Sequence, residues 1–294
     1  MKADQILIDM KKENDYFIGI DSDGCAFDSM EIKHKECFCP NTINYFELQP
    51  ISKYAREAAE FVNLYSVYRG INRFPALIKV IDLLTERNEC IKRGFKAPDI
   101  DELRDWIKIE TKLGNPALIK RVQEKPTPLM KRTLEWSLAV NETVEKIVRN
   151  VPPFPYVREN LEKMAERCDI VCVSATPNDA LNREWEEHDI ARYAKVIAGQ
   201  EIGTKKESLI TCAGKGYDSD KMLMIGDAPG DLKAAREANC LFFPINPGDE
   251  ENSWKLFYEQ AYEKFINGTY KGEYEKKLII EFEKYLPTTP PWVK

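Results

Sequence analysis

Five short apolar runs constrain the fold of this chain more than any other feature. Each ends in polar or small residues, as buried parallel strands do, and they span residues 16–20, 170–173, 195–198, 222–225 and 241–245. Helical patterns occur between the later runs, at 178–188, 206–213 and 229–238, and another at 155–168 leads into the second run. Strands that alternate with helices at this spacing predict an α/β fold with a doubly wound, mainly parallel sheet.

The long interval between the first two runs has a different character. It contains no clear alternating run but several amphipathic helical patterns, at 52–67, 75–87, 99–113 and 129–150. We therefore predict an all-helical domain at 31–150, inserted into an α/β core formed by 1–30 and 151–294. Prolines at 152, 153 and 155 mark the return to the core, because successive prolines cannot continue a helix. Residues 252–286 are predicted as two polar helices that close the core, and 288–294 as an extended end.

Charge and cysteine usage narrow the class of protein. A formal net charge of -6 argues against a nucleic-acid binder, which would need a basic face. The N-terminal residues lack the apolar core of a signal peptide and no stretch is long enough to span a membrane, so we expect no membrane partner. The eight cysteines show no zinc spacing, since Cys37 and Cys39 are too close together, and several lie inside apolar runs. We expect reduced, buried thiols and a cytoplasmic protein.

The first apolar run delivers two carboxylates, Asp21 and Asp23, at its carboxyl end, followed by Gly24. Ligands of open α/β sheets bind beyond the carboxyl ends of the strands. Two aspartates two positions apart on a strand would point the same way and repel each other without a cation nearby, whereas a turn at Gly24 would allow them different tasks. The alternative is an ordinary surface turn, since Asp and Gly are common turn residues.

Three further elements bring polar groups to the same predicted edge. Ser174 ends the second run just before a helix, where a hydroxyl and backbone N–H groups can hold a phosphoryl oxygen, although many helices begin this way. Asp227 and Asp231 follow the fourth run and would suit Mg²⁺, which prefers hard oxygen ligands; Asp231 could equally serve the helix dipole. Lys205 and Lys206 begin the helix between these elements, and either could neutralise an anion there, or simply be solvated.

Taken in order, these elements resemble the haloacid dehalogenase-like (HAD) hydrolase superfamily. Its first motif reads Asp-x-Asp-Gly-Thr/Val and its last Gly-Asp-x-x-x-Asp; this chain has DSDGC from Asp21 and GDAPGD from Gly226. The resemblance covers residues 14–30 and 152–247, and the insertion is similar to the helical cap that many members place after the first motif. It implies a phosphatase-type member with a Rossmann-like core and bound Mg²⁺.

The resemblance also implies residue roles. Asp21 would be the nucleophile that forms an aspartyl-phosphate, and Asp23 the general acid/base. Ser174 and Lys205 would bind the phosphoryl group, with Lys206 as the alternative lysine. Mg²⁺ would be held by Asp21, the Asp23 backbone carbonyl and Asp227, with Asp231 assisting directly or through water. Cys25 departs from the family pattern; we expect it to be harmless if that position contributes mainly its backbone N–H.

These roles favour a magnesium-dependent phosphohydrolase acting on a small phosphorylated metabolite. A phosphomutase shares all of the residues, and a non-catalytic phospho-ligand binder remains an alternative, although it would need neither a nucleophile nor a proton donor. Dehalogenase and phosphonate-cleaving members lack an aspartate at the position of Asp23. In the helical insertion, Arg69 and Arg73 could contact a second anionic group of the substrate, or could simply be solvated. The oligomeric state is left open.

Overall fold

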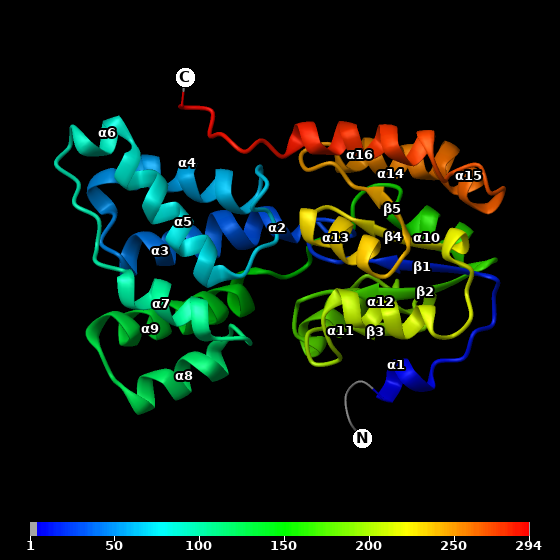
Figure 1. Cartoon of the computed structure of the whole chain (residues 1–294), viewed down its shortest axis with the longest axis horizontal. Coiled ribbons are helices and arrows are strands. Elements are labelled where there is room, and N and C mark those ends of the chain that lie inside the picture. Colours follow the sequence, from blue (N-terminus) through cyan, green and yellow to red (C-terminus); the bar gives the residue numbers. More distant parts are fainter. Residues whose placement is uncertain (1–4, 294) are drawn as a thin grey trace. The chain divides into compact units, whose positions relative to one another are not determined.

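The α/β fold predicted from the apolar runs is confirmed by the computed structural model, which describes residues 5–293. Five parallel strands form one sheet in the order β3-β2-β1-β4-β5, with β1 at its centre (Figure 1). The strands are β1 (Tyr16–Ile20), β2 (Cys168–Val173), β3 (Val196–Ala198), β4 (Met222–Gly226) and β5 (Leu241–Pro244). Since all five run the same way, their carboxyl ends meet at one edge of the sheet.

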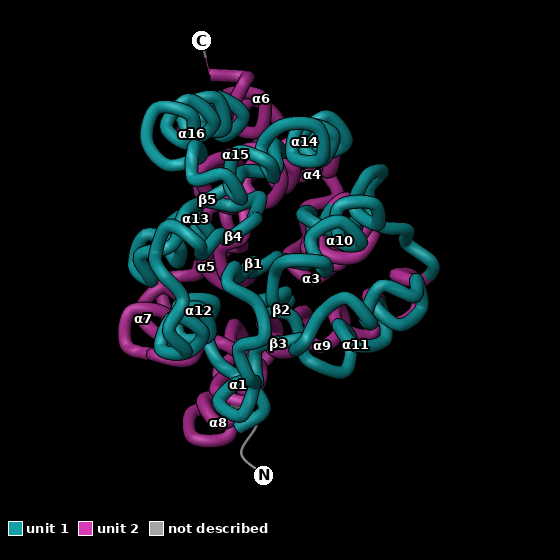
Figure 2. Tube along the Cα trace, turned by 90° about the vertical axis from the view of Figure 1, so that its right-hand side faces the viewer, with its two compact units in different colours: residues 1–30, 150–286 teal, residues 31–149, 287–294 magenta. Residues whose placement is uncertain are grey.

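The chain divides into two compact units, which Figure 2 colours separately. Unit 1 comprises residues 1–30 and 150–286, and unit 2 comprises residues 31–149 and 287–294. The helices of unit 1 are α1 (Gln5–Asp9), α2 (Ser29–Ile32, which extends into unit 2), α10 (Val157–Ala165), α11 (Asn178–Glu187), α12 (Lys205–Ala213), α13 (Pro229–Glu237), α14 (Glu250–Leu256), α15 (Tyr262–Ile266) and α16 (Glu273–Tyr285). A π-helical segment, Phe257–Ala261, joins α14 to α15.

Helices cover both faces of the sheet in unit 1. Helices α10, α11, α14 and α15 lie on one face and α12, α13 and α16 on the other (Figure 2). The first face buries a large core cluster, where Trp185 of α11 and Trp254 of α14 are completely inaccessible to solvent. The C-terminal helices therefore supply core as well as polar surface.

The amino-terminal side of the sheet is anchored by Asp169, a fully buried carboxylate in β2. It accepts backbone N–H bonds of 2.9 and 3.1 Å from Glu13 and Asn14, in the segment that leads into β1. The Tyr217 hydroxyl donates to it at 2.5 Å and the Lys195 ammonium lies 2.9 Å away. Burial alone would raise the pKa of this carboxyl, but these donors outweigh burial and lower it.

Unit 2 is helical throughout its regular elements. After a π-helical segment, Lys33–Phe38, it contains α3 (Cys39–Tyr45), α4 (Ser52–Asn63), α5 (Arg73–Glu86), α6 (Asn88–Ile91), α7 (Asp101–Ile109), α8 (Asn115–Glu124) and α9 (Pro128–Ile147). The amphipathic faces of these helices bury a second, separate core cluster that includes Phe74, Trp106 and Trp136. Unit 2 thus has a core of its own, as a separate domain requires.

The C-terminal residues 287–294 differ from our expectation, which placed them with the α/β core. They group with unit 2 because Trp292 packs edge-on against Phe61, with ring centroids 5.8 Å apart, and under the guanidinium of Arg87 at 4.3 Å. All eight cysteines are buried and free. Among residues 5–293, no helix combines the length and apolar character that crossing a membrane requires.

Candidate active site

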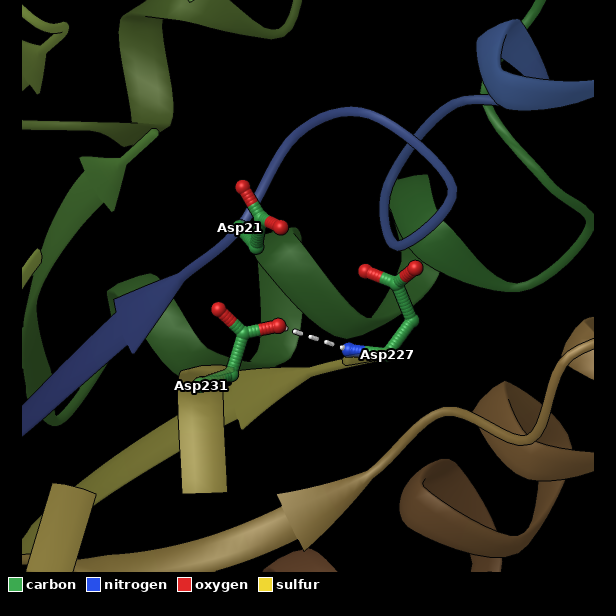
Figure 3. Close-up of side chains that lie close together, drawn as sticks. All are labelled: Asp21, Asp227 and Asp231. Atoms are coloured by element: carbon green, nitrogen blue, oxygen red, sulfur yellow. Dashed lines mark hydrogen bonds between the residues drawn. The ribbon is translucent and has the colours of Figure 1, made fainter. Parts of the chain in front are cut away.

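Three buried carboxylates gather beyond the carboxyl ends of the two central strands. Asp21 follows β1, Asp227 follows β4, and Asp231 lies in the first turn of α13. Each offers an oxygen atom within 4.8 Å of the others, and Figure 3 shows the three side chains facing a common space. Their exposed fractions are 5, 1 and 0 %, so all three acidic groups are largely shielded from bulk water.

The spacing between Asp227 and Asp231 follows from the turn that starts α13. One Asp231 carboxylate oxygen, Oδ2, accepts the backbone N–H groups of Asp227 at 3.1 Å and Ala228 at 3.0 Å, which caps the helix (Figure 3). Gly226 permits this close approach, because a Cβ atom there would lie 2.4 Å from Asp231 Cβ. The Gly-Asp-x-x-x-Asp pattern is therefore a steric requirement as well as a source of carboxylates.

Lys205 is the cation of this cluster. It is the first residue of α12, whose start is fixed by a capping box between Thr204 and Glu207. Its ammonium donates to Asp21 Oδ2 at 2.6 Å and to Asp231 Oδ1 at 2.5 Å. Lys206, the alternative lysine, instead pairs with Glu237 at 3.2 Å and is half exposed. Of the two candidates, only Lys205 reaches the carboxylates.

The single positive charge of Lys205 does not balance the negative charges of the three carboxylates in this cluster. Burial raises the pKa of Asp21; Lys205 offsets part of this effect, while the charges of Asp231 and Asp227 add to it. Burial alone would lower the pKa of Lys205, but the surrounding carboxylates outweigh burial and raise it, so this side chain remains charged. When all three acids are ionised, the three carboxylates and one ammonium leave two negative charges in excess. A divalent cation with a preference for hard oxygen ligands fits both this charge and this donor set.

Asp23 takes a different direction from Asp21. Gly24 adopts a positive φ of 75°, and the chain turns tightly after Ser22. The Asp23 carboxylate accepts hydrogen bonds from the hydroxyls of Ser29, in α2, and Thr176, the latter at 2.7 Å. It is not part of the three-carboxylate cluster found among the described residues. Whether its backbone carbonyl contacts a metal stays a prediction.

Ser174 and Cys25 lie close to these groups in the fold. Ser174 directly follows β2, the neighbour of β1, and is 3 % exposed; its Oγ accepts the Thr176 N–H at 3.2 Å. Cys25 is fully buried, and its thiol donates to the carbonyl of Ile225 in β4 at 3.6 Å. Its backbone N–H lies 3.3 Å from the Ser22 carbonyl. The thiol thus packs toward β4, and the effect of Cys25 on activity stays a prediction.

Arg69 and Arg73 both lie in unit 2. Arg69 is 3 % exposed and donates through Nη1 to the Leu64 carbonyl at 2.8 Å. Arg73 lies over the Phe38 ring at 5.1 Å and donates through Nη1 to Ser137 and Asn141 in α9. These contacts fix both guanidinium groups within the helical unit, and their role toward a substrate stays a prediction.

Sequence reasoning did not single out Ser29, Ser22 or the two buried tryptophans of the first sheet face. Ser22 accepts a hydrogen bond from Trp185 Nε1 at 3.0 Å, and Trp254 Nε1 donates to the Cys25 carbonyl at 2.8 Å. The partners are separated by 163 and 229 positions in the chain, so no local pattern connects them. Ser29 had a weak signal, since it closely follows the first motif.

Comparison with known proteins agrees with this arrangement. The family model described as haloacid dehalogenase-like hydrolase matches residues 83–245, more than half of the chain. Similar solved structures include a hydrolase of this family from Xanthomonas campestris, with 10% identity, TM-score 0.48 and coverage of 90% of this chain and 98% of that one. Another, from Streptococcus pneumoniae, has 14% identity, TM-score 0.46 and coverage of 83% and 90%.

A third solved structure is a predicted phosphoglycolate phosphatase from Haemophilus somnus, with 14% identity, TM-score 0.44 and coverage of 80% and 88%. The search of curated proteins returned no match. The matched family model begins within unit 2 and extends to the end of the sheet, so it includes Asp227 and Asp231 but not the first motif. The resemblance inferred from the motifs is confirmed, and the chain belongs to the haloacid dehalogenase-like hydrolase family.

Proposed function

We propose that this hydrolase is a magnesium-dependent phosphatase that removes phosphate from a small phosphorylated metabolite through an aspartyl-phosphate on Asp21. The observation that carries the proposal is the buried cluster of Asp21, Asp227 and Asp231 bridged by Lys205. Its two excess negative charges suit a divalent cation. The free thiols are in keeping with a reducing compartment, and we propose the cytoplasm.

Asp21 and Asp227 would hold the Mg²⁺ ion, joined by the Asp23 backbone carbonyl. Both carboxylate oxygens of Asp231 already accept hydrogen bonds, from Lys205 and from two backbone N–H groups, which suits an assisting role. When bound, the ion offsets charge on the phosphoryl oxygens and lets a carboxylate approach an anion.

In the reaction, a carboxylate oxygen of Asp21 attacks phosphorus as the ester P–O bond breaks. Asp23 donates a proton to the leaving oxygen and then accepts one from the water that hydrolyses the aspartyl-phosphate. Ser29 and Thr176 hold the Asp23 carboxylate in place for these transfers. Lys205 and Ser174 would bind the phosphoryl oxygens, where a fixed ammonium stabilises the charge that the transition state carries.

The helical residues 31–149 would act as the cap that selects the substrate, and Arg73 is the specific candidate. Burial lowers its pKa to about 10, and no carboxylate in residues 5–293 forms an ion pair with it. A half-buried cation without an anionic partner carries part of the cost of desolvation, so a second anionic group on the substrate would complete this site. Arg69 is proposed for the same role with less support. Replacement of Arg73 by Met should raise KM for a substrate with a second anionic group and leave a mono-anionic aryl phosphate unaffected.

The test is hydrolysis of p-nitrophenyl phosphate with Mg²⁺ and with excess EDTA. Wild-type turnover should require the metal, and Asp21→Asn should abolish it because an amide is a poor nucleophile. Asp105→Asn is the matched control, since that carboxylate is 75% exposed and lies in unit 2. Failure of the wild-type protein to hydrolyse any of a panel of phosphorylated metabolites, with or without metal, would favour the phospho-ligand binder. Conversion of a hexose phosphate that depends on a bisphosphate primer would identify a phosphomutase.

A further inference from the structure

The loop that carries Asp21 and Asp23 is a tight turn organised around one carbonyl group. The backbone oxygen of Ser22 accepts N–H groups from residues 25–27, at 3.3, 2.9 and 3.0 Å. Bonds that converge on a single atom restrain the distance of the loop from that atom more than its orientation. The Gly24 N–H also donates to the Phe27 carbonyl at 2.8 Å, and contacts from outside the loop add further restraints on the two aspartates.

Two buried tryptophans supply such contacts. Trp185, from α11, donates its indole N–H to Ser22 Oγ at 3.0 Å, and Trp254, from α14, donates its indole N–H to the Cys25 carbonyl at 2.8 Å. Both side chains are 0 % exposed within the core of the first sheet face. The packing of two different helices therefore fixes both indole nitrogens. These nitrogens donate hydrogen bonds to the loop on both sides of Asp23, at Ser22 and at Cys25.

The first of these contacts also fixes the direction of the Ser22 hydroxyl. An indole nitrogen can only donate, so the hydroxyl oxygen must accept from Trp185. Its own hydrogen then points to Glu184 Oε2, which lies 3.1 Å away on the same helix. Ser22 stands between Asp21 and Asp23, so a fixed side chain at that position restrains the backbone from which both carboxylates project.

We propose that Trp185 and Trp254 are positioning residues that aim Asp21 and Asp23 at the phosphoryl group. The inference rests on the proposed function, which gives those aspartates their roles. A buried neutral hydrogen bond contributes only about 1 kcal/mol to stability. Misplacement of reacting groups by about 1 Å can cost about a hundredfold in rate. The two indole N–H groups should therefore matter more to turnover than to folding.

The test replaces each tryptophan by phenylalanine in the full chain, which removes the N–H and retains an aromatic ring. We expect kcat of Trp185→Phe and of Trp254→Phe to fall by about ten- to a hundredfold with KM little changed. Tyr270→Phe is the matched control. It removes a buried donor to a backbone carbonyl, the 2.8 Å bond to Phe242 in β5, in the same unit but outside the loop. Equal kcat in all three variants would overturn the proposal.

Ser22→Ala provides a second route that leaves the core packing of the indoles intact. The double variant combines Ser22→Ala with Trp185→Phe. If Trp185 acts through the Ser22 hydroxyl, kcat of the double variant should fall no further than kcat of the more impaired single variant. Multiplication of the single effects would show that the tryptophan acts by another means and would contradict the proposed link.

Hydrogen exchange separates this inference from the proposed function, because it does not require turnover. Amides of residues 21–28 should exchange faster in both tryptophan variants than in Tyr270→Phe, measured by mass spectrometry on the whole protein. Unchanged exchange in that peptide would overturn the positioning role even if the enzyme proves to be a phosphatase. An inactive wild-type protein would overturn the function, while the exchange data would still decide whether the indoles hold the loop.

Discussion

Replacement of Gly226 by alanine tests the steric origin of the second acidic motif. The added Cβ would lie 2.4 Å from Asp231 Cβ and 2.6 Å from both Asp231 Cγ and Oδ2. Ordinary contact begins at 3.4 Å, so the start of α13 must retreat by the difference between 3.4 and 2.4 Å, or 1.0 Å. The clash is with the root of the Asp231 side chain, which cannot rotate away from it.

The expected cost follows from what this movement disrupts. Overpacking costs about 1–3 kcal/mol, and the two backbone N–H bonds to Asp231 contribute about 1 kcal/mol each, so we expect a loss of about 3–5 kcal/mol if both bonds break. Lys205 is bonded to the same carboxylate and would shift with it. Displacement of these groups by about 1 Å should lower kcat by about a hundredfold.

The assay is urea unfolding followed by tryptophan fluorescence, with kcat measured on the same samples. Gly230→Ala is the matched control, because it lies in the same helix and an added Cβ there meets nothing within 4 Å. It should leave kcat unchanged and stabilise the protein by up to about 1 kcal/mol, the difference in helix propensity. Equal stability and equal kcat in the two alanine variants would refute the steric argument.

Four further predictions rest on individual contacts. The pKa of Asp169 is lowered because its hydrogen-bond donors outweigh burial; its contribution to stability is therefore complete above the ordinary carboxyl pKa and is lost as the pH falls through the lower folded value. Asp169→Asn should destabilise the protein at neutral pH. The free energy of unfolding of this variant, measured in urea, should also fall less steeply than that of the wild type as the pH is lowered. Thr176→Val should lower kcat by about tenfold, a part of the general acid–base effect, with little change in urea midpoint. Cys25→Val should retain kcat and lose less than about 1.5 kcal/mol, since the thiol packs against β4; a large loss of kcat would show a direct role. Trp292→Ala should destabilise unit 2 by about 1–3 kcal/mol, seen as faster hydrogen exchange in α4, which carries Phe61.

The parts of the site that the sequence predicted are those encoded in short segments. Apolar runs located the strands, and the rule that ligands lie beyond strand ends placed Asp21 and Asp227 at one edge. The choice between Lys205 and Lys206 was open because both lie at the start of the same helix. The Thr204–Glu207 capping box fixes where that helix starts, but which lysine faces the carboxylates depends on the packing of α12.

The remaining features depend on contacts between distant segments. The Asp23 carboxylate is held by the hydroxyls of Ser29 in α2 and of Thr176 in the loop after β2, which lies 153 positions away in the chain. The tail at 287–294 contacts the rest of unit 2 through the Trp292 ring and through the Pro287 carbonyl, which accepts the Val67 N–H at 3.3 Å, although its prolines and threonines predicted only an extended end. Neither feature changes the periodicity from which strands and helices are predicted.

This difference between local and distant information follows from the chemistry of the site. A nucleophile, a proton donor and metal ligands must be particular residue types, so their identities are visible wherever they occur in the chain. The groups that aim them need only a donor in the right place, and an indole N–H from Trp185 or Trp254 serves because packing fixes it. The acids of this site can therefore be recognised in the sequence. Many side chains could supply the donors that position them, so those donors are identified only from the fold.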